Sequence, residues 1–211
     1  MLFFNFCYNL SMIKAIIFDW GGVLIKDCST ARLNYCASKL GVNANKLKIE
    51  FQKYEKDFWK NKLTELELWE KICKKLEVSV PKPSSIWLNA LKKFIIENKK
   101  VIKVVRELKK QGYLLGFLSN TEIPSVEYFK KQKYNIFDIL VFSCMEGYVK
   151  PEKEIYEIAL NKLGVRPEEA IFIDDKEAHI KGAKKLGIST ILFTSAENLI
   201  KELQKFGVNV G

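Results

Sequence analysis

Four polar groups in this chain combine the side chains that bind a hard cation and a phosphoryl group. They are Asp19, Ser119 with Asn120, Lys150, and Asp174 with Asp175. Carboxylate oxygens are ligands of Mg²⁺, which takes few of them and leaves room for phosphate oxygens and water. A carboxylate such as Asp19 can also attack phosphorus, while a hydroxyl and an ammonium can hold the oxygens of a phosphoryl group. These residue types indicate phosphoryl chemistry, provided that the fold brings them together.

Three of these groups follow an apolar run, which is typical of side chains at the end of a buried strand. The runs cover residues 15–18, 113–118 and 170–173, and Gly21-Gly22 turns the chain after the first of them. Taken one at a time, such polar residues are at least as often helix caps or turns. If the strands are neighbours in one parallel sheet, all three ends lie along the edge where such sheets bind ligands. Their shared placement favours a site over independent caps.

Lys150 stands in the segment Gly147-Tyr148-Val149-Lys150-Pro151, immediately before a predicted helix. A proline is favoured at the first position of a helix, so the sequence predicts that this helix begins at Pro151. The amide groups of a helix start favour an anion. We therefore expect the Lys150 ammonium to lie beside an anion site, although a lysine taken alone is most often a surface residue.

The second half of the chain alternates predicted strands and helices. Strands are expected at 113–118, 139–142, 170–173 and 190–193, with helices at 99–111, after Pro124, and at 151–163, 177–186 and 196–206. This alternation predicts right-handed βαβ units. The expected fold is therefore α/β, with a Rossmann-like parallel sheet.

The segment between the first strand and this alternation has helical periodicity and no convincing strand. Helices are expected from Ser29 or Thr30 to Gly41, over 44–60, from the capping box Thr64-Glu65-Leu66-Glu67 to about Leu76, and from Ser84-Ser85. An insertion there hangs over the ligand edge of the sheet, as a lid does. The predicted division is a core of 12–25 and 98–211, a helical cap of 26–97, and an N-terminal extension of 1–11, before an equally acceptable start at Met12.

The composition favours a small anionic substrate over a nucleic acid or a membrane. The net charge is +10, yet the basic residues are almost all lysine, which indicates a solvated surface rather than base recognition. A positive field still attracts small anions. The five cysteines form no C-x-x-C pair and the chain shows no transmembrane candidate, so we expect neither a zinc site nor disulfides, and a cytoplasmic location. The oligomeric state is left open.

From Lys14 onward, the chain resembles the haloacid dehalogenase-like hydrolase superfamily. The matching motifs are Phe18-Asp19-Trp20-Gly21-Gly22-Val23-Leu24, Leu118-Ser119-Asn120-Thr121, Val149-Lys150-Pro151, and Phe172-Ile173-Asp174-Asp175. The nearest branch contains small sugar-phosphate phosphatases and the N-terminal phosphatase domain of soluble epoxide hydrolases. By this resemblance Asp19 is the nucleophile. Asp19, the Gly21 carbonyl, Asp174 and Asp175 hold Mg²⁺, and Ser119, Asn120 and Lys150 hold the phosphoryl group.

Two positions depart from the pattern of this superfamily. Most of its phosphatases carry a second Asp, a general acid, where this chain has Gly21. General acid catalysis is worth roughly 10²–10⁴-fold, so Gly21 alone predicts a preference for leaving groups that need little protonation, such as those of anomeric sugar or acyl phosphates. The second departure is His179, where asparagine is frequent. We expect His179 to support the neighbouring loop rather than to act in catalysis.

The function predicted from these residues is that of a Mg²⁺-dependent phosphatase for a small phosphorylated metabolite, such as a sugar phosphate, acting through an aspartyl-phosphate. One alternative is a metal-independent haloacid dehalogenase, against which stands the absence of the substrate-binding arginine that those enzymes place after the first motif. Another is a non-catalytic relative that binds a phosphorylated ligand, which Gly21 keeps open. The substrate is selected by the cap, where Arg32, Phe58, Trp59 and Trp69 are candidates.

Overall fold

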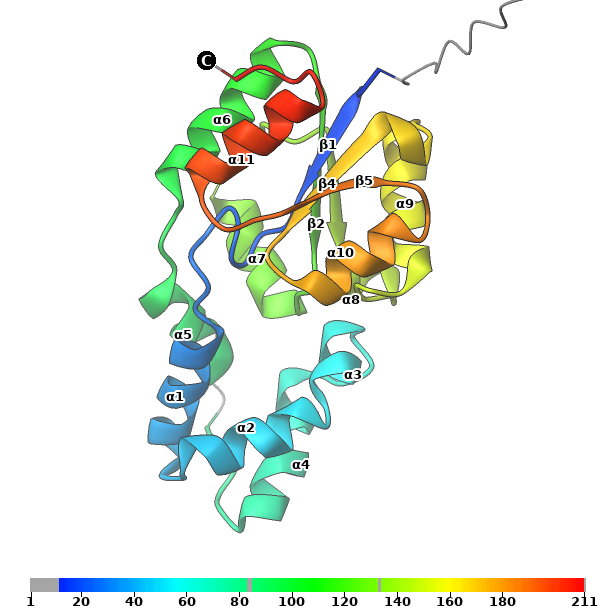
Figure 1. Cartoon of the computed structure of the whole chain (residues 1–211). Coiled ribbons are helices and arrows are strands. Elements are labelled where there is room, and N and C mark those ends of the chain that lie inside the picture. The colour runs from blue at the N-terminus through cyan, green and yellow to red at the C-terminus, as the bar shows by residue number, and fades with distance from the viewer. Residues whose placement is uncertain (1–11, 83–84, 133, 211) are drawn as a thin grey trace, which may run out of the picture.

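The computed structural model describes residues 12–82, 85–132 and 134–210, so the predicted N-terminal extension of 1–11 lies outside the described residues. Five parallel strands form one sheet in the order β3-β2-β1-β4-β5 (Figure 1). The strands are β1 (Ala15–Phe18), β2 (Leu114–Ser119), β3 (Ile139–Phe142), β4 (Ala170–Asp174) and β5 (Ser189–Leu192). The predicted α/β Rossmann-like sheet is confirmed.

Helices cover both faces of this sheet because successive side chains of a strand point to opposite faces. Ile16 and Phe18 of β1 pack into a hydrophobic cluster with helices α6, α7 and α11, while Ala15 and Ile17 pack into a second cluster with α9 and α10. These helices are α6 (Lys99–Lys110), α7 (Ile123–Lys131), α9 (Lys153–Leu163), α10 (Glu177–Lys184) and α11 (Ala196–Lys205). Burial on both faces explains why β1 and β4 read as continuous apolar runs.

Five helices follow β1 and lie beyond the carboxyl ends of the strands (Figure 1). They are α1 (Ser29–Leu40), α2 (Ala44–Gln52), α3 (Glu55–Trp59), α4 (Glu65–Leu76) and α5 (Ile86–Phe94). They share a hydrophobic cluster of their own, which includes Leu47, Phe58 and Trp69. The predicted helical cap inserted after the first strand is therefore present. Its boundaries at 25/26 and 97/98 stay a prediction, since Cys28 and Leu91 pack with the core cluster.

The ends of the cap helices follow their sequence signals. The Thr64 side chain accepts from the Glu67 amide and the Glu67 carboxylate accepts from the Thr64 amide, so the predicted capping box is confirmed. Gly41 ends α1 in the left-handed conformation, with a φ of 67°. Ser85 caps α5 by accepting from the Leu88 amide; Ser84, the other residue expected at this start, lies outside the described residues.

The predicted helix over 44–60 is wrong, because the structure divides it into α2 and α3. The chain turns at Lys53 and Tyr54, whose amides donate to carbonyls three residues earlier rather than four. Phe51 of α2 stacks on Trp87 with 4.7 Å between ring centroids, and Phe58 of α3 meets the same ring edge-on at 6.4 Å. The break allows both phenyl rings to contact one indole, a tertiary contact that the helical spacing of the apolar residues does not show.

The predicted start of a helix at Pro151 is also wrong. Helix α9 begins at Lys153 with Glu152 as its cap residue. Another short helix, α8 (Ser143–Glu146), comes between β3 and Lys150 and was not expected. Lys150 is therefore not at the start of a helix. Its contacts come instead from residues that are distant in the sequence.

Candidate active site

Asp19 lies at the point of the sheet where the strand order reverses. From β1 the chain continues to β2 on one side and returns to β4 on the other, and ligands bind at such switch points outside the carboxyl ends of the strands. Phe18 pairs with Ile173 in the register of β1 and β4, and the Asp19 amide donates to the Ile173 carbonyl at 3.0 Å. This register brings Asp19 beside Asp174, as the sequence predicts.

Lys150 joins these two carboxylates. Its Nζ lies 2.7 Å from Asp19 Oδ1 and 2.7 Å from Asp174 Oδ2, and it donates to the Leu118 carbonyl at 3.1 Å. The residue is 3% exposed, although a lysine is almost never buried without partners. The ammonium therefore lies among carboxylates of the site and not, as predicted, beside the amides of a helix start.

The charges in this buried group shift one another's pKa values. Burial raises the pKa of Asp19 to about 7; Lys150 opposes this rise, and Asp174 and Asp175 add to it. Burial acts in the same direction on Asp174, but Lys150 and His179 hold its pKa below the usual range. Burial alone would lower the pKa of Lys150, yet Asp174 and Asp19 keep it above its ordinary value. One ammonium does not neutralise the carboxylates around it, so the site has an excess of negative charge.

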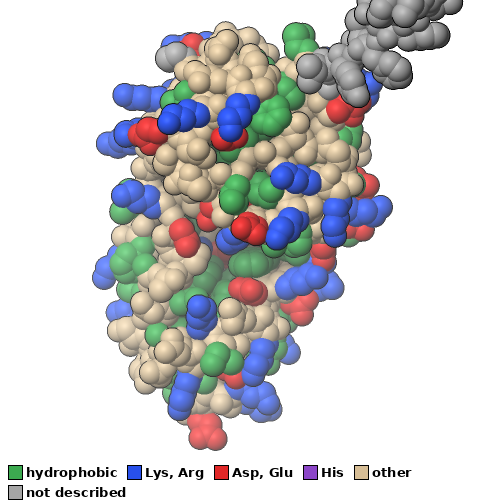
Figure 2. Space-filling model, in the orientation of Figure 1, with side chains coloured by type: hydrophobic (Ala, Val, Ile, Leu, Met, Phe, Trp, Pro, Cys, Tyr) green, Lys and Arg blue, Asp and Glu red, His purple; other side chains and the backbone are tan. Residues whose placement is uncertain are grey.

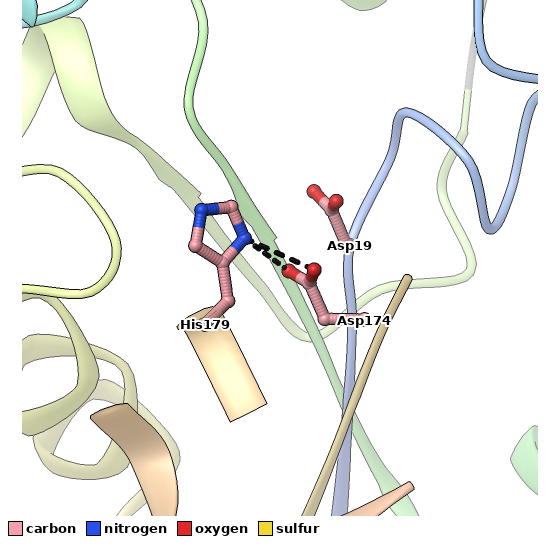
Figure 3. A group of neighbouring side chains, drawn as sticks. All are labelled: Asp19, Asp174 and His179. Atoms are coloured by element: carbon pink, nitrogen blue, oxygen red, sulfur yellow. Dashed lines mark hydrogen bonds and ion pairs between the residues drawn. The ribbon is translucent and has the colours of Figure 1, made fainter. Parts of the chain in front are cut away.

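His179, in the first turn of α10, contacts Asp174 (Figure 3). Its Nδ1 lies 3.0 and 2.9 Å from the two Asp174 oxygens. Burial lowers the pKa of His179, and the ionised carboxylate can only accept, so a neutral ring donates from Nδ1. The Lys176 amide also donates to Asp174 Oδ1 at 2.8 Å. His179 thus contacts the carboxylate of Asp174, and its expected role in supporting the neighbouring loop stays a prediction.

The residues around Asp175 match the needs of a cation. Its Oδ1 is buried and has no hydrogen-bond partner among the described residues, and burial together with Asp174 raises its pKa. The Asp175 carboxylate packs on Gly22, where a Cβ would meet Oδ2 at 2.2 Å, so only glycine is accommodated. The Gly21 carbonyl accepts no backbone hydrogen bond within the described ranges. An orphaned carboxylate oxygen, a free carbonyl and the excess negative charge together fit a divalent cation.

Asp174 lies close to Asp19 and His179, and both of its carboxylate oxygens already have hydrogen-bond partners. Ligand atoms of Asp19, Asp174 and His179 come within 4.8 Å of one another. The two oxygens of Asp174, however, already face Lys150, His179 and the Lys176 amide. Asp175 is thus the carboxylate with an oxygen to spare, and a ligand role for Asp174 stays a prediction.

Asn120 ties the loop after β2 to Lys150. Its Oδ1 accepts from the Lys150 amide at 2.8 Å and its Nδ2 donates to the Lys150 carbonyl at 3.0 Å. Ser119, the last residue of β2, is buried and lines the cavity beside Asp19. The structure thus places Asp19, Gly21, Ser119, Asn120 and Lys150 around one cavity, with Asp174 against Lys150 and Asp175 against Gly22. It engages the Asn120 amide in positioning Lys150.

A cavity of about 300 Å³ lies between the sheet edge and the cap. We call its core side the floor, formed by Asp19, Trp20, Gly21, Ser119, Asn120, Thr121, Glu122, Lys150, Lys176 and His179. We call its cap side the roof, formed by Ser29, Thr30, Arg32, Leu33, Lys48, Phe51, Gln52, Glu55, Trp59, Trp87 and Leu91. Two cap residues proposed from the sequence to select the substrate, Arg32 and Trp59, are in the roof.

Roof and floor are joined on one side by an ion pair between Arg32 and Glu122. The Arg32 Nη2 lies 2.9 Å from Glu122 Oε1, with side chains only 12% and 2% exposed. The guanidinium also lies 4.0 Å over the Trp87 ring, and Ser125 Oγ donates to the same Glu122 oxygen. Sequence reasoning missed Glu122, because nothing in the motif that precedes it indicates a partner ninety residues away.

A second junction links α3 to the core. The buried Ser143 Oγ accepts from the Thr121 amide at 2.9 Å and donates to the Trp59 carbonyl at 2.8 Å. Lys56 and Lys60 each lie 2.8 Å from a different oxygen of Glu152. Because Thr121 and Glu152 each stand two residues after a site residue, these contacts hold α3 directly over the catalytic loops.

The loop that carries Lys150 also lies against α10 at close range. A Cβ at Gly182 would meet Pro151 Cβ at 2.8 Å and the Pro151 carbonyl at 2.9 Å. The hydroxyl of Tyr156 donates to the His179 carbonyl at 2.8 Å in the same region. Because Gly182 has no side chain, α10 can pack directly against the loop that carries Lys150.

The family model of haloacid dehalogenase-like hydrolases matches residues 13–187, which include every residue of the floor. The chain belongs to this family of hydrolases. The predicted family is thereby confirmed, and with it the assignment of the protein as an enzyme.

This hydrolase has relatives among larger proteins. It is 28% identical to acyl-CoA dehydrogenase family member 10 of Mus musculus over 200 residues, 90% of the chain and 19% of that protein. It is 26% identical to bifunctional epoxide hydrolase 2 of Sus scrofa over 213 residues, 92% of the chain and 38% of that protein. Glyceraldehyde 3-phosphate phosphatase of Pyrococcus furiosus is 34% identical over 95 residues, 43% of the chain and 39% of that protein. The hydrolase spans less than half the length of each.

A solved structure shows the same fold. A HAD family enzyme from Bacteroides thetaiotaomicron, in complex with magnesium and inorganic phosphate, superposes with a TM-score of 0.69 at 25% identity, covering 87% of this hydrolase and 95% of that chain. Within the described residues of the hydrolase, none of the helices is both long and apolar enough to span a bilayer. Its basic side chains are spread over the face seen in Figure 2 rather than gathered into one patch.

Proposed function

We propose that the protein is a Mg²⁺-dependent phosphatase that hydrolyses a small phosphorylated metabolite, such as a sugar phosphate, through an aspartyl-phosphate on Asp19. The observation that carries this proposal is the Asp19 carboxylate at the switch point of the sheet, with Lys150 Nζ 2.7 Å away. Relatives named as phosphatases and a similar enzyme crystallised with magnesium and phosphate support it.

Two donors orient the nucleophile. The Trp20 amide donates to Asp19 Oδ1 at 2.7 Å, and Lys150 contacts the same oxygen. Asp19 Oδ2 has no hydrogen bond to any described residue, so one carboxylate oxygen is left for reaction. A carboxylate held in this way can attack phosphorus and form an acyl phosphate that water later cleaves.

The cation would be held by the Asp19 carboxylate, the Gly21 carbonyl and Asp175, with Asp174 in the same group. When bound, Mg²⁺ would supply positive charge that offsets the repulsion between a phosphate dianion and an anionic nucleophile. Lys150 adds a second positive charge on the same side. Ser119 and Lys150 are placed to hold phosphoryl oxygens, while Asn120 keeps the Lys150 backbone in position.

The cap restricts access to this site. The aromatic side chains of the roof line the same cavity as Asp19, and the two junctions keep the cap against the loops that carry the site residues. Exclusion of bulk water strengthens the electrostatic interactions within the cavity. A cavity of about 300 Å³ suits a small metabolite.

A screen of phosphorylated metabolites with and without Mg²⁺ tests the proposal. We expect phosphate release from at least one compound, dependence on Mg²⁺, and capture of a fluoroberyllate adduct at Asp19. Binding of phosphorylated compounds without turnover would indicate a non-catalytic relative instead.

Hydrolytic activity that persists in EDTA would favour metal-independent dehalogenation. Such an enzyme needs a guanidinium for the substrate carboxylate, and the Arg32 guanidinium is already paired with Glu122. The structure therefore offers no free guanidinium in the described cavity for that reaction, since Arg32 is the one arginine that lines it.

A further inference from the structure

The floor of the cavity has no side chain at Gly21 to protonate a leaving group. A Cβ built on Gly21 would meet no atom within 4 Å, so the position opens into free space rather than against a neighbour. An alkoxide leaving group needs a proton, and a positioned acid contributes roughly 10²–10⁴-fold to such a step. Another group of the cavity must supply it if alkyl phosphates are substrates.

Besides Asp19, three carboxylic acids line the cavity: Asp27, Glu55 and Glu122. Asp27 accepts from the amide and the hydroxyl of Ser29, contacts that lower its pKa and keep it ionised. Glu122 is paired with Arg32. Two of the three acids therefore have hydrogen-bond or ion-pair partners of their own.

Glu55 differs from both. It is half-buried, and it has neither a hydrogen bond nor an ion pair to any described residue. Burial raises the pKa of its carboxyl, which the positive charge of Lys176 opposes only in part. Burial therefore favours the protonated form of the Glu55 carboxyl, whereas the pKa of Asp27 is lowered.

The helix that carries Glu55 is held against the core. It is the first residue of α3, whose carboxyl end is joined through Ser143 to Thr121 of the floor. Lys60 of the segment that follows α3 contacts Glu152, next to the loop that carries Lys150. The helix is thus held from two sides beyond the carboxyl ends of the strands (Figure 1), and Glu55 lines the same cavity as Asp19 and Ser119.

We propose that Glu55 is the general acid and base of this phosphatase, supplied by the cap in place of the side chain missing at Gly21. In the first step an Asp19 oxygen forms a bond to phosphorus, the bond from phosphorus to the leaving oxygen breaks, and that oxygen takes the proton of the Glu55 carboxyl. In the second step the Glu55 carboxylate takes a proton from water, the water oxygen attacks phosphorus, and the bond to Asp19 breaks. Inorganic phosphate leaves, and Glu55 is protonated again.

This inference rests on the proposed phosphatase function and changes one expectation drawn from the sequence. Gly21 alone predicts a steep dependence of rate on leaving-group acidity. With Glu55 as the acid, the wild-type protein shows a shallow dependence, and the steep one appears only when Glu55 is removed.

The test measures leaving-group release in single turnovers with Mg²⁺ for nitrophenyl, phenyl and alkyl phosphates, comparing wild type with Glu55→Gln. We expect Glu55→Gln to slow the alkyl ester by roughly 10²–10⁴-fold and the nitrophenyl ester by less than about tenfold, because nitrophenolate leaves without a proton. Asp57→Asn is the matched control: it removes a carboxylate from the same helix, but its exposed side chain does not line the cavity. It should leave the dependence unchanged.

Two further variants separate catalysis from packing. Glu55→Asp should recover part of the lost rate on the alkyl ester. Adding Gly21→Asp to Glu55→Gln should also restore that rate, since the space at Gly21 accepts a side chain. Thermal unfolding checks that each variant is folded.

An active wild type whose dependence on leaving-group acidity is the same as that of Glu55→Gln would overturn the role of Glu55 and leave the phosphatase function intact. A wild type that cleaves none of the esters and none of the screened metabolites would overturn both proposals.

Discussion

The floor and the roof of the cavity are built differently. On the floor, Lys150 and Asp19 form a buried group with Asp174, with distances of 2.7 Å from the ammonium to each carboxylate. The roof mixes polar side chains with three aromatic ones, of which Phe51 and Trp87 are stacked at 4.7 Å between ring centroids. Strand ends fix the floor to the sheet, whereas the roof belongs to helices with their own hydrophobic cluster. The sheet therefore fixes the proposed nucleophile and cation site, while the cap can change roof side chains other than Glu55 to select substrates without moving that nucleophile.

Among the floor residues, Asp19 is the one whose substitution should have the largest effect on activity. Asp19→Asn removes the nucleophile while keeping the size of the side chain, so we expect kcat to fall by roughly 10⁴-fold or more. Phosphate release from the best substrate of the screen measures this. Retention of most of the activity in a folded Asp19→Asn variant would contradict an aspartyl-phosphate.

Removal of divalent cations tests the proposed cation site. We expect EDTA to lower activity by at least about 10²-fold, because a bound divalent cation stabilises developing charge by several kcal/mol, and added Mg²⁺ to restore it. Mg²⁺ should also raise the thermal stability, by about 2.7 kcal/mol at a hundredfold excess over Kd.

Asp175→Asn sharpens the same test, since Asp175 Oδ1 is the orphaned oxygen of the site. This variant should lose most of the stabilisation by Mg²⁺. A Mg²⁺ effect of unchanged size in Asp175→Asn would place the cation elsewhere.

Substitution in the buried ion pair between Arg32 and Glu122 should have the next largest effect, a loss of stability. Arg32→Met leaves Glu122 buried without its cation, and breaking a buried pair from one side typically costs about 3–5 kcal/mol. Urea unfolding measures this loss. Arg32→Met combined with Glu122→Gln should recover a large part of it, because the uncompensated charge is then gone. Additive losses in the double-mutant cycle would show that the two side chains are not coupled.

The ion pairs of Glu152 in the second junction should matter less for stability than the buried pair. The Glu152 side chain is 23% exposed, and its partners Lys56 and Lys60 are 62% and 13% exposed. Exposed ion pairs are worth about 0–1 kcal/mol and broken buried pairs cost about 3–5 kcal/mol, so Glu152→Gln should lower the free energy of unfolding by less than Arg32→Met does. An effect as large as that of Arg32→Met would mean that both junctions hold the cap equally.

Much of the fold could be predicted because local signals agree with the tertiary structure. The apolar runs of β1 and β4 are buried on both faces, and β3 has the predicted bounds at Ile139–Phe142. The failures are at 44–60 and Pro151. There, packing of Phe51 and Phe58 on one indole breaks a regular pattern, and a proline precedes its helix instead of opening it.

The floor was predictable and the junctions were not, for the same physical reason. Strand ends of a parallel sheet converge by topology, so Asp19, Ser119 and Asp174 could be placed together from their position in sequence. Contacts such as that between Arg32 and Glu122 depend on how the cap helices are oriented, which no local pattern encodes. Glu55 gave no sequence signal, because it is one of many glutamates on lysine-rich helices.

Gly182 has a consequence for any attempt to stabilise this protein. It lies inside α10, where replacing glycine by alanine ordinarily gains about 1 kcal/mol of helix stability. A ranking of substitutions by helix propensity would therefore choose Gly182→Ala early. The methyl group would fall 2.8 Å from Pro151 Cβ and push on the loop that delivers Lys150 to the two carboxylates. Gly182 therefore allows α10 to approach the loop that carries Lys150. Its replacement by alanine would stabilise the helix locally but would displace the Lys150 ammonium from its carboxylate partners.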